Sequence, residues 1–114
     1  MEKGRNLSDR VEQVVPLEER LGVSLSAIGA YVRTDADGRA ISVAGEIRPQ
    51  RGTRLEQDLE VVVTVYDEKR RVIGTGSHKV YRKTFWTFET FGLDLFGIPR
   101  DTEVARIRVF PKGT

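Results

Sequence analysis

The sequence predicts an all-β protein, an antiparallel sandwich of about seven short strands. Residues 41–47 show the clearest alternation between apolar and more polar side chains, which is typical of a strand with one buried face. Residues 61–66 are nearly all β-branched or aromatic, and such stiff side chains favour strands over helices. Turn-forming residues such as Asp37 and Gly38 separate the apolar segments at the spacing of a sandwich.

One domain accounts for the whole chain. Its 114 residues suffice for one hydrophobic core, and 39% hydrophobic with 32% charged residues are typical of a folded globular domain. We predict the sandwich over residues 23–114, preceded by an N-terminal extension over residues 1–22. Residues 1–6 are mostly polar, and we expect them to be mobile.

The extension has two possible structures. A helix fits because Asp9 and Glu12 have the spacing of a capping box and Pro16 would end the helix. Its buried face would consist of Leu7, Val11 and Val14. A second short helix fits residues 16–21, followed by Gly22. The alternative is an extended arm that pairs with the edge of a sheet, and the sequence leaves both structures open.

The sandwich is predicted to begin with a hairpin. Its first strand places apolar residues at alternate positions between Leu25 and Val32. Residues 35–38 form the turn, because an Asp-Gly pair tolerates the positive φ angles of a tight turn. The second strand ends at Pro49. Its inward face consists of Ile41, Val43, Gly45 and Ile47.

A second hairpin, over residues 59–80, organises the rest of the fold. Both faces of its first strand are fairly apolar, so we expect an inner strand whose second face is at least partly covered. The valines of one face are Val61, Val63 and Val65. Residues 67–71 form a charged turn, which we expect to be a solvent-exposed tip. In the second strand, Gly74 and Gly76 indicate a bulge or a close approach of another segment.

Two further strands complete the prediction. One begins at Lys79 and continues through the aromatic residues to Phe88, with apolar residues following as far as Phe96. The last covers residues 104–110 and is closed by Pro111. Its inward side chains are expected to be Ala105, Ile107 and Val109.

Residues 41–111 resemble a known family. The matching segments are the alternating strand 42–47, the pair Tyr66-Asp67, the run Val-Ile-Gly-Thr-Gly at 72–76, and the aromatic segment with Phe85 and Phe88. This order resembles the FxLYD-type and related immunoglobulin-like β-sandwich domains of prokaryotes. The resemblance implies an immunoglobulin-like fold and a non-enzymatic role, and it carries over no catalytic residue. Residues 84–88 lack the Pro-Gly lead-in of the family, and residues 1–22 have no counterpart in it.

The composition excludes several kinds of chemistry. The sequence has no cysteine, which rules out disulfides, thiolate metal sites and cysteine nucleophiles. His78 is the single histidine, so a histidine-based metal site lacks further ligands of that type. A catalytic triad would have to use His78, and its neighbour Ser77 points to the opposite face of a strand. We therefore expect a protein that is not an enzyme and that holds no metal or cofactor.

Basic and aromatic residues mark a candidate interaction surface. Arginines and aromatic rings together can bind a nucleic-acid backbone and stack on bases. Acidic residues interleave with them, at Glu56 and Asp58 for example, which favours ordinary solvated loops. Strand alternation sets Trp86 opposite Phe85, so one of the two should be exposed and could anchor an interface. The candidate surface comprises Tyr81, Arg82, Trp86, Arg48, Arg51 and Arg54.

The sequence therefore predicts a non-catalytic binding or structural module. Its partner would be another protein or a second copy of the chain, and exchange of the N-terminal arm would give a homodimer. One alternative is a nucleic-acid-binding domain that uses the basic loops, and another is a small-molecule or carbohydrate site near Trp86 and Tyr81. The absence of cysteine and of a signal peptide or apolar span leads us to expect a cytoplasmic protein that does not insert into membranes.

Overall fold

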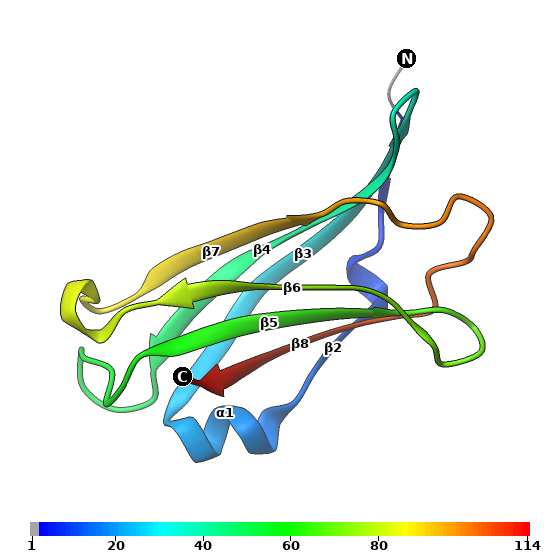
Figure 1. Cartoon of the computed structure of the whole chain (residues 1–114). Coiled ribbons are helices and arrows are strands. Elements are labelled where there is room, and N and C mark those ends of the chain that lie inside the picture. The colour runs from blue at the N-terminus through cyan, green and yellow to red at the C-terminus, as the bar shows by residue number, and fades with distance from the viewer. Residues whose placement is uncertain (1–2) are drawn as a thin grey trace.

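The computed structural model describes residues 3–114, which form two four-stranded sheets packed face to face (Figure 1). The first sheet has the order β1 (Lys3–Asn6), β3 (Val23–Asp35), β4 (Gly38–Pro49) and β7 (Glu89–Leu95). The second sheet has the order β2 (Val11–Gln13), β8 (Arg106–Gly113), β5 (Leu59–Tyr66) and β6 (Val72–Val80). The predicted class, an all-β sandwich, is confirmed. Only β2 and β8 run parallel among the strand pairs of residues 3–114.

The β3–β4 hairpin follows the prediction. In its turn, the side-chain Oδ1 of Asp35 accepts the Asp37 N–H at 2.9 Å, and Gly38 has a φ of 137°. Ile41, Val43 and Ile47 are buried on β4, whereas Ala44 on the opposite face is exposed. The hairpin and β1 project beyond the rest of the sandwich (Figure 1), and the molecule including them measures 44 × 28 × 22 Å.

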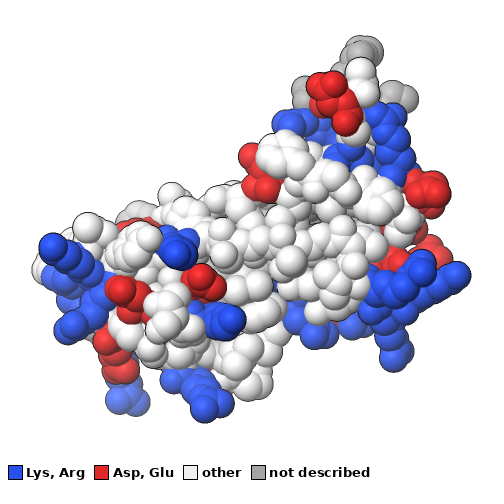
Figure 2. Space-filling view, viewed as in Figure 1, with Lys and Arg blue, Asp and Glu red and all other residues white. Residues whose placement is uncertain are grey.

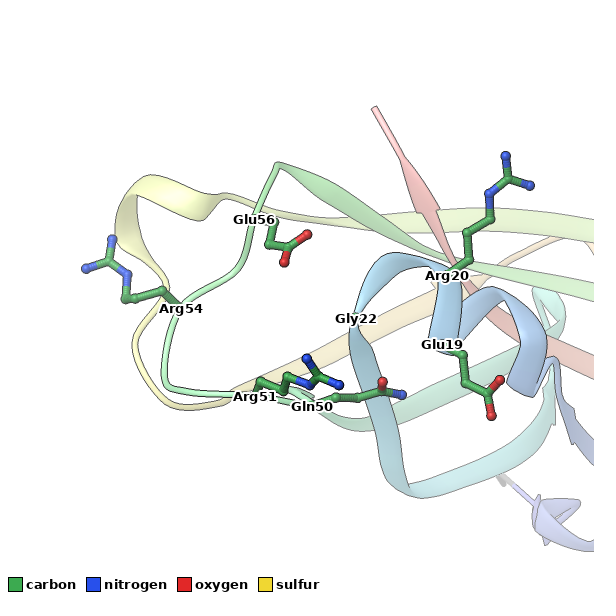
Figure 3. Close-up of a pocket in the computed structure, with 7 residues that line it drawn as sticks. All are labelled: Glu19, Arg20, Gly22, Gln50, Arg51, Arg54 and Glu56. Atoms are coloured by element: carbon green, nitrogen blue, oxygen red, sulfur yellow. The ribbon is translucent and has the colours of Figure 1, made fainter.

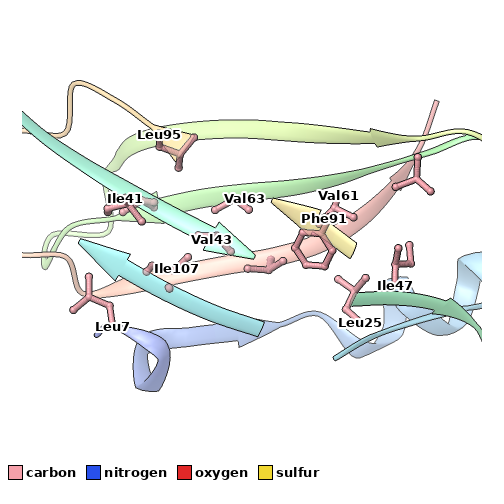
Figure 4. Packing of buried hydrophobic residues seen from close by; sticks show 14 of the residues in the cluster. Leu7, Leu25, Ile41, Val43, Ile47, Val61, Val63, Phe91, Leu95 and Ile107 are labelled. Atoms are coloured by element: carbon pink, nitrogen blue, oxygen red, sulfur yellow. The ribbon is translucent and has the colours of Figure 1, made fainter. Parts of the chain in front are cut away.

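The core lies between the sheets (Figure 4). The second sheet contributes three of the four valines of β5, which face inward and are fully buried: Val61, Val63 and Val65. They pack against side chains of the first sheet that include Ile41, Val43 and Phe91. Because β5 lies between β8 and β6, the prediction of an inner strand is confirmed.

The glycines of β6 mark a close approach between the sheets, as predicted. A side chain at Gly74 would lie 2.7 Å from a methyl group of Ile98, and one at Gly76 would lie 2.6 Å from Leu95. Next to them, the ring Nδ1 of His78 lies 3.1 Å from the Gly92 carbonyl oxygen of β7. One side of the sandwich is therefore closed by contact between the edge strands β6 and β7.

The N-terminal segment takes the second of its two predicted structures. Residues 3–6 form β1 and residues 11–13 form β2, each paired with the edge of a sheet, so the extended arm is confirmed and the helix expected around Asp9 to Val14 is wrong. Residues 1–2 lie outside the described part, and the mobility expected of residues 1–6 stays a prediction. The chain instead forms a short 3₁₀ turn, η1 (Ser8–Arg10), and then β2. Leu7 explains the difference, because its side chain is buried in the core and its N–H donates to the Ala30 carbonyl at 2.8 Å.

The second short helix is confirmed as α1 (Val15–Leu21), with Pro16 in its first turn and Gly22 in the left-handed conformation at its end. It is the longest helix of residues 3–114, and no helix in that range has the length and apolar character needed to cross a membrane.

Three predictions for the C-terminal half are wrong: the length of the strand from Lys79, the inward side chain of Ala105, and the end of the last strand at Pro111. The strand expected from Lys79 to Phe88 ends at Val80, because residues 81–88 cross from one sheet to the other through a 3₁₀ turn, η2 (Arg82–Thr84). Ala105 is exposed, and Pro111 is buried inside β8. Beyond Val109, β8 pairs with β5 alone, and a proline is tolerated where one side of a strand has no ladder.

Candidate interaction surface

Two loops meet at the end of the sandwich opposite the projecting hairpin (Figure 1). They are residues 50–58, between β4 and β5, and residues 81–88, between β6 and β7, and we call them together the loop end. The Thr87 N–H donates to the Thr53 carbonyl at 2.8 Å, and the Arg82 N–H donates to the Asp58 carboxylate at 2.8 Å. Leu55 and Phe85 anchor the two loops in the core. Hydrogen bonds and buried side chains therefore hold the backbone of the loop end in place, and its other side chains project from it.

All six candidate residues lie at this end. Arg51 and Arg54 lie on the first loop, Tyr81, Arg82 and Trp86 lie on the second, and Arg48 lies near the end of β4. The contacts shown by the structure join three of them directly. The Arg54 guanidinium carbon lies 5.5 Å from the centre of the Trp86 ring, and its Nη2 donates to the Arg82 carbonyl at 3.2 Å.

The prediction that one of Phe85 and Trp86 is buried and the other exposed is confirmed. The two residues lie in a loop, however, and not in the strand that was predicted. Phe85 is 1% exposed, and Trp86 is 65% exposed. Tyr81 and Phe88 are also about half exposed, at 53% and 47%. Exposed aromatic side chains are therefore concentrated on the second loop.

Phe88 and Arg20 belong to this surface and were missed by the sequence analysis. Phe88 looked like part of a strand, yet it lies outside β7, with the Arg48 guanidinium 5.8 Å from its ring centre. Arg20 comes from α1, which is brought to the loop end by the bond from the Gln50 N–H to the Gly22 carbonyl at 2.9 Å. The helix signal alone could have placed Arg20 near a helix terminus but not beside this loop.

Two clefts flank Arg54. The larger, about 390 Å³, is lined by Arg54, Asp58, Arg82 and Lys83. The smaller, about 240 Å³, separates α1 from the first loop (Figure 3), and its lining residues are Glu19, Arg20, Gly22, Gln50, Arg51, Arg54 and Glu56. Each cleft thus carries three basic residues against one or two acidic ones.

Charge is distributed unevenly over the molecule. On the face shown in Figure 2, Lys and Arg gather at the two ends, and the middle is largely uncharged. No group of three or more His, Asp or Glu side chains that could hold a metal occurs within residues 3–114. The loop end instead offers flat aromatic faces beside guanidinium groups, an arrangement that can pack apolar side chains and donate paired hydrogen bonds to anions.

Comparison with known proteins adds little to this description. No protein-family model matches the chain, and no curated protein sequence matches it. Among solved structures, the chain is similar to a glycosyl hydrolase family 2 member from Bacteroides cellulosilyticus DSM 14838, with a TM-score of 0.40 and 12% identity over 80% of this chain. It is likewise similar to a putative β-galactosidase from Bacteroides fragilis, with a TM-score of 0.40 and 14% identity over 82% of this chain. The chain spans 14% and 16% of the length of those two proteins.

Proposed function

We propose that this protein is a non-catalytic binding module that contacts a partner protein through the loop end. The observation that carries the proposal is the exposure of Trp86, Tyr81 and Phe88 on one pinned loop, with arginines stacked on Trp86 and Phe88. Tryptophan, tyrosine and arginine are the residues most enriched at the energetic centres of protein interfaces. A loop that is already ordered also loses less conformational entropy on binding.

The partner is another protein or a second copy of this chain. If it is a second copy, contact between loop ends is favoured over exchange of the N-terminal arm. Residues 3–13 supply β1 to the first sheet and β2 to the second, so exchange would have to break pairing in both sheets. A cytoplasmic location and kinship with FxLYD-type domains stay predictions from the sequence, and both agree with a binding role.

Nucleic acid is the second candidate, and the cluster of Arg48, Arg51, Arg54 and Arg82 favours it. Asp58 and Glu56 interrupt these arginines in the two clefts. A nucleic-acid strand needs a continuous positive groove along its backbone, so we rank nucleic acid below protein. A carbohydrate would stack on Trp86 or Tyr81 and would bind without dependence on salt.

The test is affinity capture with three versions of the full chain: wild type, Trp86→Ala and Phe96→Ala. Phe96 is a matched control, because it is 70% exposed and follows the far end of β7. We expect to capture a partner with wild type and with Phe96→Ala. The purified partner should bind Trp86→Ala roughly tenfold more weakly or worse, because truncating a hot-spot tryptophan costs at least about 1–2 kcal/mol. Analytical ultracentrifugation of the same three proteins covers the case of a second copy. Equal binding by all three proteins would refute the proposal.

A further inference from the structure

The basic residues that line the two clefts are not paired with acidic side chains in the part of the chain that the structure describes. Several other arginines form ion pairs with carboxylates: Arg5 and Arg10 with Glu103, Arg48 with Glu46, Arg71 with Asp67, and Arg106 and Arg108 with Glu12. Arg39 and Arg100, outside the loop end, donate to backbone carbonyls instead. Within residues 3–114, no such pair involves the basic residues of the two clefts, which are Arg20, Arg51, Arg54, Arg82 and Lys83. Their charge is available to a ligand.

The two central guanidinium groups are nevertheless held in place. Arg54 donates to the Arg82 carbonyl, and Arg82 donates through Nε to the Leu55 carbonyl at 3.2 Å. Asp58 is the one acidic residue of the larger cleft, and its carboxylate accepts a hydrogen bond from the Arg82 backbone N–H. Bonds to backbone carbonyls orient a guanidinium without neutralising it, so these groups keep both their position and their charge.

Arg54 lines both clefts, and its guanidinium also stacks on the exposed Trp86 ring. An anionic group bound at Arg54 would therefore lie next to an apolar surface of more than half-exposed tryptophan. A ligand that uses both features carries a negative charge beside an apolar or aromatic side chain. A short acidic protein segment has this chemistry, because Asp or Glu can alternate with large apolar residues.

We infer that the partner bound at the loop end presents an acidic segment in which Asp or Glu side chains flank an apolar residue that packs on Trp86. This inference rests on the proposed function. Arg54, Arg82 and Lys83 receive the carboxylates, and the Trp86 face receives the apolar side chain. The complex is held by charge-assisted hydrogen bonds and weakens as salt screens the cationic cleft.

The test is selection of random short peptides displayed on phage against the immobilised full chain. Selected peptides are then synthesised and titrated against wild type, Trp86→Ala, and the double variant Arg54→Gln/Lys83→Gln. The matched control is Lys69→Gln/Arg70→Gln, which removes the same charge in the turn between β5 and β6, outside the loop end. Circular dichroism checks that each variant is folded. A single-stranded oligothymidylate is titrated in parallel.

We expect selected peptides enriched in Asp and Glu next to apolar residues. Their affinity should fall about tenfold or more in Trp86→Ala and in Arg54→Gln/Lys83→Gln, and it should stay within about twofold in the control. Peptides that depend on Trp86 but lack acidic enrichment would overturn the inference and leave the proposed function standing. Oligothymidylate binding that depends on Trp86 would overturn the inference in favour of nucleic acid. If no selected peptide depends on Trp86, both the inference and the proposed function fail.

Discussion

Asp67 is buried even though it lies in a turn made almost entirely of charged residues. Its Oδ1 accepts the backbone N–H groups of Lys69 and Arg71 at 2.9 and 2.8 Å, and its Oδ2 accepts the Arg71 Nε at 2.9 Å. The prediction that residues 67–71 form a solvent-exposed tip is wrong for Asp67. Its carboxylate instead organises the turn that joins β5 to β6.

These bonds make the stability of the protein depend on pH. The hydrogen bond from the Arg71 backbone N–H, with further help from the Arg71 side chain and the Lys69 N–H, holds the pKa of Asp67 below its ordinary value of 3.8, although burial alone would raise it. A lowered pKa in the folded state stabilises the protein above the pKa of the unfolded state, and this contribution disappears as the pH falls through the folded value.

We therefore expect Asp67→Asn to be less stable than wild type at neutral pH, with the difference shrinking as the pH falls below 3.8. Thermal unfolding at a series of pH values measures both proteins. Glu68→Gln is the control, because Glu68 is the exposed neighbour of Asp67 and should change stability little at any pH. A difference between Asp67→Asn and wild type that stays constant down to acidic pH would contradict this account.

At the scale of the element, α1 protects an edge of the first sheet. The strand β1 pairs with β3 over residues 31–34, so residues 23–26 of β3 have a strand on one side only. There, the Leu25 N–H donates to Oε1 of Glu18 at 3.1 Å, and the Leu25 carbonyl accepts Nε2 of Gln13 at 2.9 Å. Glu18 also accepts Nε2 of Gln13, at 3.0 Å. Side chains thus replace the missing strand and block pairing with another chain.

Removal of the Glu18 side chain tests this role. Glu18 is 5% exposed, so Glu18→Ala leaves the buried Leu25 N–H without its partner, and we expect a loss of about 1–3 kcal/mol in the free energy of unfolding. Glu19→Ala is the matched control: Glu19 is exposed on the same helix, and we expect a change of less than about 0.5 kcal/mol. Urea denaturation measures both. Equal stability of the two variants would show that Glu18 does not cap the edge.

At the scale of the whole molecule, the sequence predicted the elements that carry a local signal. The alternation around Ile41 and Val43, the turn at Gly38 and the helix before Gly22 depend on neighbouring residues, and all three are confirmed. The strands β1 and β2 are only four and three residues long, which is too short for a period to appear. Residues 81–88 are aromatic enough to resemble a strand, but their position between sheets is a tertiary property.

For the candidate site, too, the sequence predicted the residues but not how they are arranged in space. Residue type alone identified Trp86, Arg54 and their neighbours as a possible surface. The approach of α1, and the contrast between paired and unpaired arginines, depend on which loops meet in the folded chain. No spacing in the sequence shows that Glu12 pairs with Arg106 and Arg108 while Arg54 stacks on Trp86. The resemblance of residues 41–111 to FxLYD-type domains stays a prediction.

The N-terminal segment joins the two halves of the sandwich, because one continuous stretch supplies the edge strand β1 to the first sheet and the edge strand β2 to the second. Between them, Leu7 is inserted into the core, and the Ser8 hydroxyl accepts the Ala30 N–H at 3.0 Å. This segment closes the side of the sandwich opposite the β6–β7 contact. Without it, residues 31–34 of β3 and residues 107–109 of β8 would present unpaired backbone groups.

Deletion of residues 1–14 should therefore do more than lower stability. We expect the shortened protein to associate in a concentration-dependent way beyond the full chain, because exposed strand edges pair with other chains. Leu7→Ala is the control: it empties the core position at a cost of about 2–5 kcal/mol but keeps both strands, so it should unfold more easily without associating. Sedimentation velocity at several concentrations, combined with thermal unfolding, separates the two effects. A deletion protein that sediments like the full chain at every concentration would show that the segment adds stability without protecting the edges.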